Sequence, residues 1–204
     1  MRALILFGAL VLSGATAHAD QLHGVFGCDT GEHHERWALK TRSKPASLAE
    51  AKSITLAQML TWAVPAGHTD SEQQAIPPRE PKLYTVTGFV RKIKLSDDET
   101  NPDCDLHLEL AASGDQNATR VIVEIPPTQH ALQQQAAGMF NLSDSVQSHT
   151  DNGAKALAIT VTGYAFLDLS HQCAQFPKAG CKHGGKAVQT IWEIHPVLAL
   201  KWAQ

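Results

Sequence analysis

Residues 103–110, with the sequence DCDLHLEL, combine the alternation of a strand with side chains that ligate metals. At a strand period of two, Cys104 and three leucines fall on one face, and the opposite face carries Asp103, Asp105, His107 and Glu109. The apolar face predicts packing against a core. The other face differs from an ordinary solvated strand, which favours Thr, Lys, Ser and Gln, so it indicates a candidate site.

The segments around this stretch predict four more strands and one helix. Residues 84–95 and 119–125 are rich in β-branched residues, and residues 157–169 and 190–202 place apolar side chains on one face. Residues 129–140, QHALQQQAAGMF, hold helix formers and no β-branched residue, which predicts a helix. Gly88 and Gly163 stand within the similar hexapeptides TVTGFV and TVTGYA, where a glycine inside a strand indicates a bend.

The predicted order is strand, strand, strand, helix, strand, strand. This is the order of the OB-fold, a five-stranded Greek-key barrel whose helix lies between the third and fourth strands. We therefore predict a mainly β chain with minor α content, in which residues 83–204 form an OB-like barrel. A β-sandwich of two sheets is the alternative.

Residues 20–82 are predicted to form an N-terminal extension that packs on the barrel. Residues 35–41, ERWALKT, alternate in the manner of a short strand. Apolar spacing over residues 47–62 predicts one or two short helices, with Thr55 as an N-cap. Residues 65–81 are rich in Pro, Gln and Glu and predict a loop that leads into the barrel.

Residues 1–19 have the form of a signal peptide: a positive start, an apolar run and the small-residue ending AHA. We expect cleavage after Ala19 and export to the periplasm or the medium. No later apolar run is long enough to span a bilayer, so no membrane anchor is expected after cleavage. The formal net charge of −3 argues against a nonspecific nucleic-acid binder, which is usually strongly basic.

All four cysteines follow the predicted cleavage point, and an even number in an exported chain favours disulfides. Of the three possible connectivities we favour Cys173–Cys181, because the intervening Pro- and Gly-containing loop is short. Cys28–Cys104 would then be the second bridge. A zinc site is the weaker alternative, since no C-x-x-C pair occurs.

A second pair of ligand-type side chains lies on the outward face of residues 190–202. The predicted site joins the two outward faces, with further residues from FLDLSH: it comprises Asp105, His107, Glu193, His195, Asp168 and His171. A mixed carboxylate and imidazole set suits zinc, manganese or ferrous iron, whereas an all-oxygen set suits calcium or magnesium. The expected cofactor is a divalent metal, with zinc, manganese and calcium as the candidates.

The motifs ERWALKT, DCDLHLEL, VEIP, FLDLSH and WEIHPV occur in this order along the chain. This combination resembles a group of exported bacterial proteins with the same motif order, and the resemblance covers most of the chain after residue 19. It implies export and no particular activity. The insert between Cys173 and Cys181 departs from the group, which tends to have a Gly-rich loop there.

A fainter resemblance is to the staphylococcal-nuclease type of OB barrel. In that family a D-G-D-T-like turn enters the second strand, and this chain has D-C-D-L there. The resemblance implies that Asp103, Asp105 and Glu124 occupy comparable places. It carries the alternative of a metal-dependent, nuclease-like phosphodiesterase.

Three interpretations of the acid and imidazole residues remain open: cross-strand ion pairs, metal binding without chemistry, and catalysis. No G-x-S-x-G, Walker or Rossmann motif occurs, so common hydrolase, NTPase and dehydrogenase functions lack support. We therefore predict an exported, monomeric OB-fold binding module, and whether it is an enzyme stays open. Its expected ligand is a nucleotide, an oligonucleotide or a saccharide.

Overall fold

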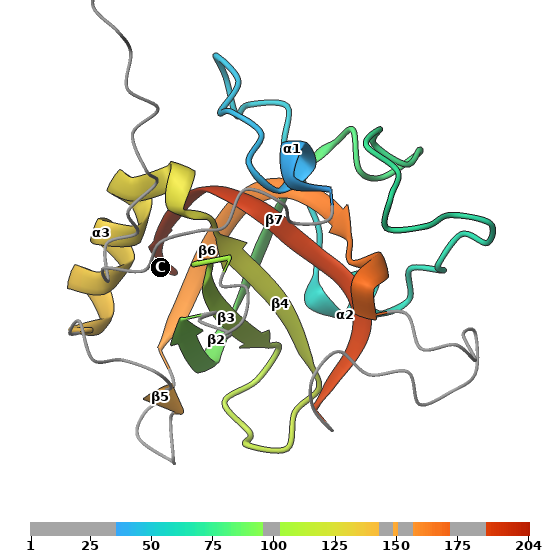
Figure 1. Ribbon diagram of the computed structural model, residues 1–204. Helices are drawn as coiled ribbons and strands as arrows, with labels where there is room; N and C mark the ends of the chain where they lie inside the picture. The colour runs from blue at the N-terminus through green and yellow to red at the C-terminus, as the bar shows by residue number, and fades with distance from the viewer. Residues whose placement is uncertain (1–35, 96–102, 143–148, 151–156, 172–186) are drawn as a thin grey trace, which may run out of the picture.

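Five strands form a closed barrel in the computed structural model, which describes residues 36–95, 103–142, 149–150, 157–171 and 187–204 (Figure 1). The barrel strands are β2 (Leu83–Leu95), β3 (Leu106–Ala111), β4 (Arg120–Ile125), β6 (Ala158–Leu167) and β7 (Val188–Trp202). Their order is β2-β3-β4-β7-β6, and β6 pairs with β2 to close the barrel. Only the β4–β7 pair is parallel among these five. The predicted OB-like topology is confirmed.

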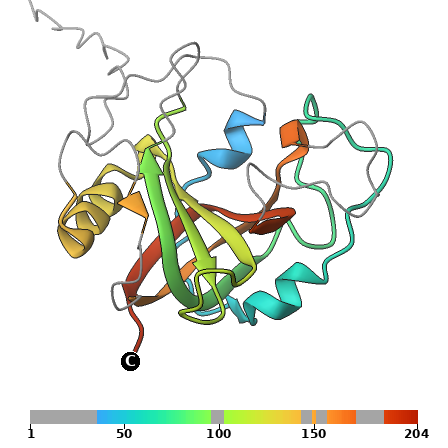
Figure 2. The same ribbon diagram turned by 90° about the horizontal axis from the view of Figure 1, so that it is seen from below.

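Shorter elements surround this barrel. The 3-10 turn η1 (Pro127–Gln129) leads into α3 (His130–Phe140), so the predicted helix between the third and fourth barrel strands is confirmed. Figures 1 and 2 show α3 and α2 on different sides of the barrel. The remaining elements are α1 (Trp37–Lys40), β1 (Lys52–Ser53), α2 (Leu56–Leu60), β5 (His149–Thr150) and η2 (Leu169–His171).

Strand alternation decides which side chains fill the barrel. The core contains Leu106, Leu108 and Leu110 of β3, whose neighbours His107 and Glu109 point away from it. β4 contributes its valines and Ile125 in the same way, and α2 adds Leu56 and Met59. The predicted apolar face of residues 103–110 is therefore the inner face of the barrel.

The two mid-strand glycines lie where another segment approaches closely. A Cβ at Gly163 would lie 2.3 Å from the Pro196 carbonyl oxygen, and one at Gly88 would lie 2.6 Å from a methyl carbon of Leu56. The β6–β7 register shifts on both sides of Gly163, which is the signature of a bulge. These glycines thus allow the long strands to curve around the barrel.

The two similar hexapeptides are partners across one strand pair. Thr85 lies opposite Thr162 and Thr87 lies opposite Thr160, in the antiparallel β2–β6 ladder. Each threonine pair is joined by a hydrogen bond of 2.8 Å between hydroxyls. The repetition in the sequence therefore reflects the seam that closes the barrel.

A buried ion pair attaches the extension to the barrel. Arg36 and Glu80 are 1 % and 0 % exposed, and the guanidinium donates two hydrogen bonds, of 2.7 and 2.6 Å, to the carboxylate. Arg36 also donates to the Leu167 carbonyl, and Glu80 accepts from the backbone N–H of Leu167 and of Ile76. The pair therefore ties the start of the extension, its last loop and the end of β6 together.

The extension departs from its predicted secondary structure at one place. The predicted strand over residues 35–41 is wrong for the described part, because Trp37–Lys40 form the short helix α1. Arg36 precedes it with a left-handed φ of 57°, and its side chain is fixed in the buried ion pair with Glu80. Thr55 is the N-cap of α2 and forms a capping box with Gln58, so that prediction is confirmed.

Cys104 is fully buried and is not a free thiol. The other cysteines, Cys28, Cys173 and Cys181, lie outside the described residues, so both predicted disulfides stay predictions. The signal peptide also lies outside them. In the part of the chain that the structure describes, no helix combines the length and the apolar character needed to cross a bilayer.

Candidate metal centre

The register of three strands brings distant acid and imidazole residues together. His107 of β3 lies opposite Glu124 of β4, and Val123 of β4 lies opposite Ile194 of β7. Glu124 and His195 directly follow that second pair, so both point away from the core at the same level. β4 therefore lies between β3 and β7, whose outward faces were expected to meet. It supplies Glu124, which lies between the site residues of those two strands.

Three of these residues form a compact cluster. Asp105, Glu124 and His195 each offer one ligand atom, and these atoms lie within 4.8 Å of one another. The His195 ring lies between the two acids, with Nε2 3.2 Å from Asp105 Oδ2 and Nδ1 2.9 Å from Glu124 Oε2. Both Asp105 oxygens are buried and accept no hydrogen bond within the described residues. A buried carboxylate without a donor is costly, and a bound cation would compensate it.

The cluster continues into a wider network through Glu124. Its second oxygen, Oε1, lies 2.7 Å from Nδ1 of His107, so one carboxylate contacts two imidazoles. Glu193 Oε2 lies 3.6 Å from His195 Nδ1. The structure thus brings together Asp105, His107, Glu193 and His195, the four residues that were expected to share a site.

The network is buried, so the prediction of a surface site is wrong in this respect. Asp105 and His195 are 0 % exposed, Glu193 is 1 % exposed and His107 is 3 % exposed. Alternation in the sequence shows which side chains leave the core but cannot show what covers them. Here α1 of the extension contacts β7 and lies over it (Figure 1).

The extension also adds a cation to the network. The Lys40 ammonium lies 3.7 Å from Asp103 Oδ2, and its side chain is 12 % exposed. Burial alone would lower the pKa of Lys40, but the nearby carboxylates outweigh it and raise the pKa; in order of effect they are Asp105, Glu124, Asp103 and Asp168. Lys40 therefore stays charged and partly balances the acids.

The pKa values of the cluster are pushed in opposite directions. Burial and the neighbouring Asp103 charge raise the pKa of Asp105 well above its usual range. Burial also acts on Glu124, but hydrogen bonds from His107 and His195 hold its pKa well below the usual range. Burial opposes the imidazolium of His195, yet the Asp105 charge and the nearby Glu124 and Glu193 carboxylates raise its pKa to about 10. In the absence of a metal the protonated His195 is thus a counter-ion of Glu124 at neutral pH, and a metal that binds His195 would displace this proton.

Asp168 and His171 form a separate pair. Asp168 is buried at the end of β6, accepts hydrogen bonds from the N–H and hydroxyl of Ser170, and lies within hydrogen-bond distance of His171 Nδ1. The His171 side chain is 47 % exposed. Neither residue belongs to the three-residue cluster. The Asp168 charge also contributes to the raised pKa of Lys40.

Two members of the site were not among the predicted ligands. Glu124 is the single acid in RVIVEI, and a lone outward carboxylate in an otherwise apolar strand was the available signal. The resemblance to the nuclease barrel also pointed to it. Lys40 could not be found in this way, because its segment was assigned to a strand.

The chain matches no protein-family model, and neither the curated proteins nor the solved structures provide a significant match. Fold and site therefore define the class of protein. It is a closed five-stranded mixed β-barrel with a buried Asp105, Glu124 and His195 cluster that could hold a metal ion.

Proposed function

We propose that this protein is an exported OB-like binding module that holds one divalent transition metal through Asp105, Glu124 and His195. The observation that carries the proposal is the buried convergence of three ligand atoms within 4.8 Å, one of them on a carboxylate that accepts no hydrogen bond within the described residues. Two oxygens and one imidazole nitrogen suit zinc, manganese or ferrous iron better than calcium. The signal-peptide pattern of residues 1–19 supports export.

Neighbouring residues support the ligands in the way that metal sites require. A histidine that ligates through one nitrogen usually hydrogen-bonds a carboxylate or carbonyl through the other. His195 has a carboxylate beside each nitrogen, Asp105 at Nε2 and Glu124 at Nδ1. Glu124 is itself held by His107. Whichever imidazole nitrogen binds the metal, the other has a carboxylate beside it that fixes the orientation of the ring.

Burial favours binding over hydrolysis. A phosphodiesterase must bring its substrate to the metal, and both Asp105 and His195 are 0 % exposed. The nuclease-like function therefore stays the weaker candidate. A buried metal would instead join β3, β4 and β7 on the outer wall and stabilise the barrel by its binding free energy.

The test is metal analysis of protein purified without a histidine tag, followed by thermal melts with zinc, manganese or calcium and with a chelator. We expect about one bound equivalent, a higher melting temperature with zinc or manganese, and loss of both effects with chelator. Asp105→Asn is the informative variant, because the Asp105 oxygens accept no hydrogen bond from the described residues and the change removes only the charge that faces His195 Nε2. The matched control is Asp115→Asn, since Asp115 is an exposed loop acid.

The proposal requires that Asp105→Asn loses the metal-dependent shift while Asp115→Asn keeps it. A wild type that holds no metal, and melts identically with each ion, would show that His195 acts only as the counter-ion of the acids. An equal shift in wild type and Asp105→Asn would place the metal elsewhere.

A further inference from the structure

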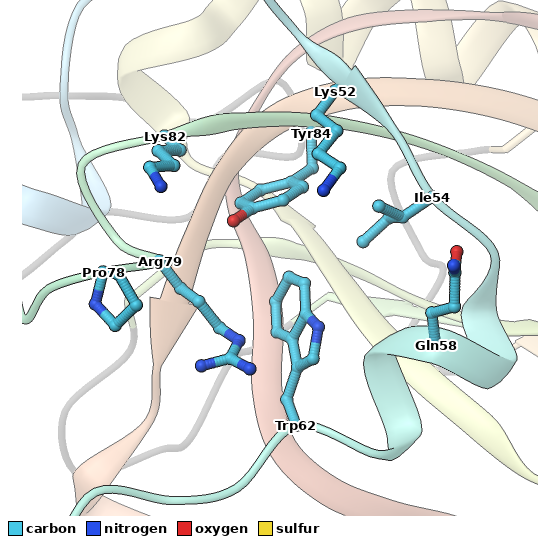
Figure 3. A pocket seen from close by; sticks show the side chains of 8 residues that line it. All are labelled: Lys52, Ile54, Gln58, Trp62, Pro78, Arg79, Lys82 and Tyr84. Carbon is cyan, nitrogen blue, oxygen red and sulfur yellow. The ribbon is translucent and has the colours of Figure 1, made fainter.

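A pocket of about 260 Å³ lies away from the cluster, between the extension and the start of β2. Every residue that lines it lies in residues 52–82, except Tyr84 of β2. Figure 3 shows the rings of Tyr84 and Trp62 at its centre, with Arg79 and Lys82 on one side and Lys52 on the other. The volume lies just below the range of roughly 300–1,000 Å³ that drug-sized ligands occupy, so it fits a single small molecule.

The described residues give the pocket a positive charge. Lys52, Arg79 and Lys82 line it, and none of the described lining residues is acidic. Among the described residues none of the three forms an ion pair, in contrast with the Arg36–Glu80 pair of the same extension. Three cations gathered in one hollow repel each other, and an anion bound between them would relieve that repulsion.

Aromatic contacts orient one of these cations. The Arg79 guanidinium carbon lies 5.0 Å from the Trp62 ring centroid and 5.7 Å from that of Trp192. A guanidinium that stacks through its face keeps its N–H edges for a bidentate bond to an oxyanion. Trp62 also contacts the Tyr84 ring at 4.9 Å between centroids, and Trp192 holds its place through a hydrogen bond to the Ala63 carbonyl.

Further donors line the same space. The side chain of Gln58 accepts through Oε1 from the Thr55 N–H in the capping box, which turns its amide nitrogen away from the cap. Burial raises the pKa of Tyr84 although the Arg79 charge opposes it, so the phenol stays a protonated donor. The pocket thus offers donors and cations to an anionic group and apolar ring surface to the rest of a ligand.

We propose that this pocket binds a small phosphate monoester that carries a planar ring, of the nucleoside monophosphate class. Arg79, Lys82 and Lys52 hold the phosphate, and the ring packs against Trp62 and Tyr84. Phosphate is favoured over a carboxylate because three uncompensated cations match a dianion. The proposal gives the extension a binding role, and it does not depend on the metal centre.

The test is calorimetric titration of the full chain with adenosine 5′-monophosphate, adenosine and inorganic phosphate. We expect the monophosphate to bind at least about tenfold more tightly than either part alone. Arg79→Gln and Lys82→Gln should each weaken it by about tenfold or more, and Trp62→Leu should reduce it to the level of inorganic phosphate. The control Lys201→Gln removes an exposed cation outside the pocket and should leave the affinity unchanged.

The nucleotide titrations and the metal analysis are separate measurements on the wild-type chain, so failure of the metal centre and failure of this pocket are distinguishable. Equal affinity for inorganic phosphate and the monophosphate would overturn the proposal, because the rings would then contribute nothing. No measurable heat, or unchanged binding in Arg79→Gln, would overturn it as well.

Discussion

Replacing Arg36 by methionine should be among the most destabilising single changes in the extension. The substitution keeps most of the apolar stem but removes a guanidinium that donates two hydrogen bonds to the fully buried Glu80. Removing one partner of a buried ion pair usually costs about 3–5 kcal/mol, because the other charge stays buried without compensation. Glu80 keeps the backbone donors of Ile76 and Leu167, so we expect a cost near the lower end, about 3 kcal/mol.

Urea unfolding, followed by tryptophan fluorescence, measures this loss. A cost of about 3 kcal/mol lowers the folding equilibrium constant by roughly two orders of magnitude. The double variant Arg36→Met, Glu80→Gln should lose less than the single variant, because no unpaired charge remains. The matched control is Arg79→Met, since Arg79 also stacks on an aromatic ring but has no carboxylate partner in the described residues. It should cost about 1 kcal/mol or less.

An equal cost for Arg36→Met and Arg79→Met would refute this reasoning, since ring contact alone would then explain both. A double variant less stable than Arg36→Met would refute the assignment of the cost to the unpaired Glu80.

Three further outcomes are expected. Gly163→Ala should destabilise the barrel by about 1–3 kcal/mol or more, because the new Cβ would lie 2.3 Å from the Pro196 carbonyl oxygen. The control Gly138→Ala, at an exposed position of α3 with no atom near the new Cβ, should stabilise the protein by up to about 1 kcal/mol. Equal effects of the two substitutions in urea unfolding would contradict this reasoning. Burial would raise the pKa of Glu109, but the neighbouring His107 and the hydrogen bond from Arg120 outweigh it and lower the pKa to about 2, so the contribution of Glu109 is complete above pH 4.5 and is lost as the pH falls towards 2. Glu109→Gln should therefore reduce the loss of unfolding free energy between pH 7 and pH 3 by about 1–3 kcal/mol, after allowance for solvent screening. Thermal melts over this pH range that match those of the wild type would count against the Glu109–Arg120 ion pair. Thr55→Ala removes the α2 N-cap and should cost about 1 kcal/mol, with an unchanged urea midpoint as the contrary result.

The barrel was predictable because short segments of the sequence show the order of its strands and helix and the alternation of apolar and polar residues. The inner leucines of β3 and the outward His107 follow from a period of two, and so does the outward His195 of β7. Gly88 and Gly163 indicated the bends from the sequence alone, and the structure adds the segments that pack closely against them. These signals are local, so a single sequence carries them.

The central residues of the site come from strands that are far apart in the sequence, so the site was only partly predictable. Glu124 becomes its middle residue because β4 pairs with β3 on one edge and with β7 on the other, and strand neighbours follow from topology, not from spacing. The burial of Asp105 depends on what covers the outer wall. Lys40 belongs to α1, which directly follows Arg36. The partner of Arg36 is Glu80, 44 residues later in the chain, so the local sequence does not show this contact.

The position of β4 between β3 and β7 has a consequence for folding kinetics. β7 is the last strand in chain order, and it reaches β4 across the long connection that contains α3 and β6. Contacts of such high sequence separation form late, since the entropy of closing the loop must be overcome first. A chain whose β7 has not docked lacks His195 at the cluster and has only two acids there. Metal binding would therefore follow closure of the barrel. The rate at which refolding protein takes the metal from a metal-chelating dye would then report the last step of folding.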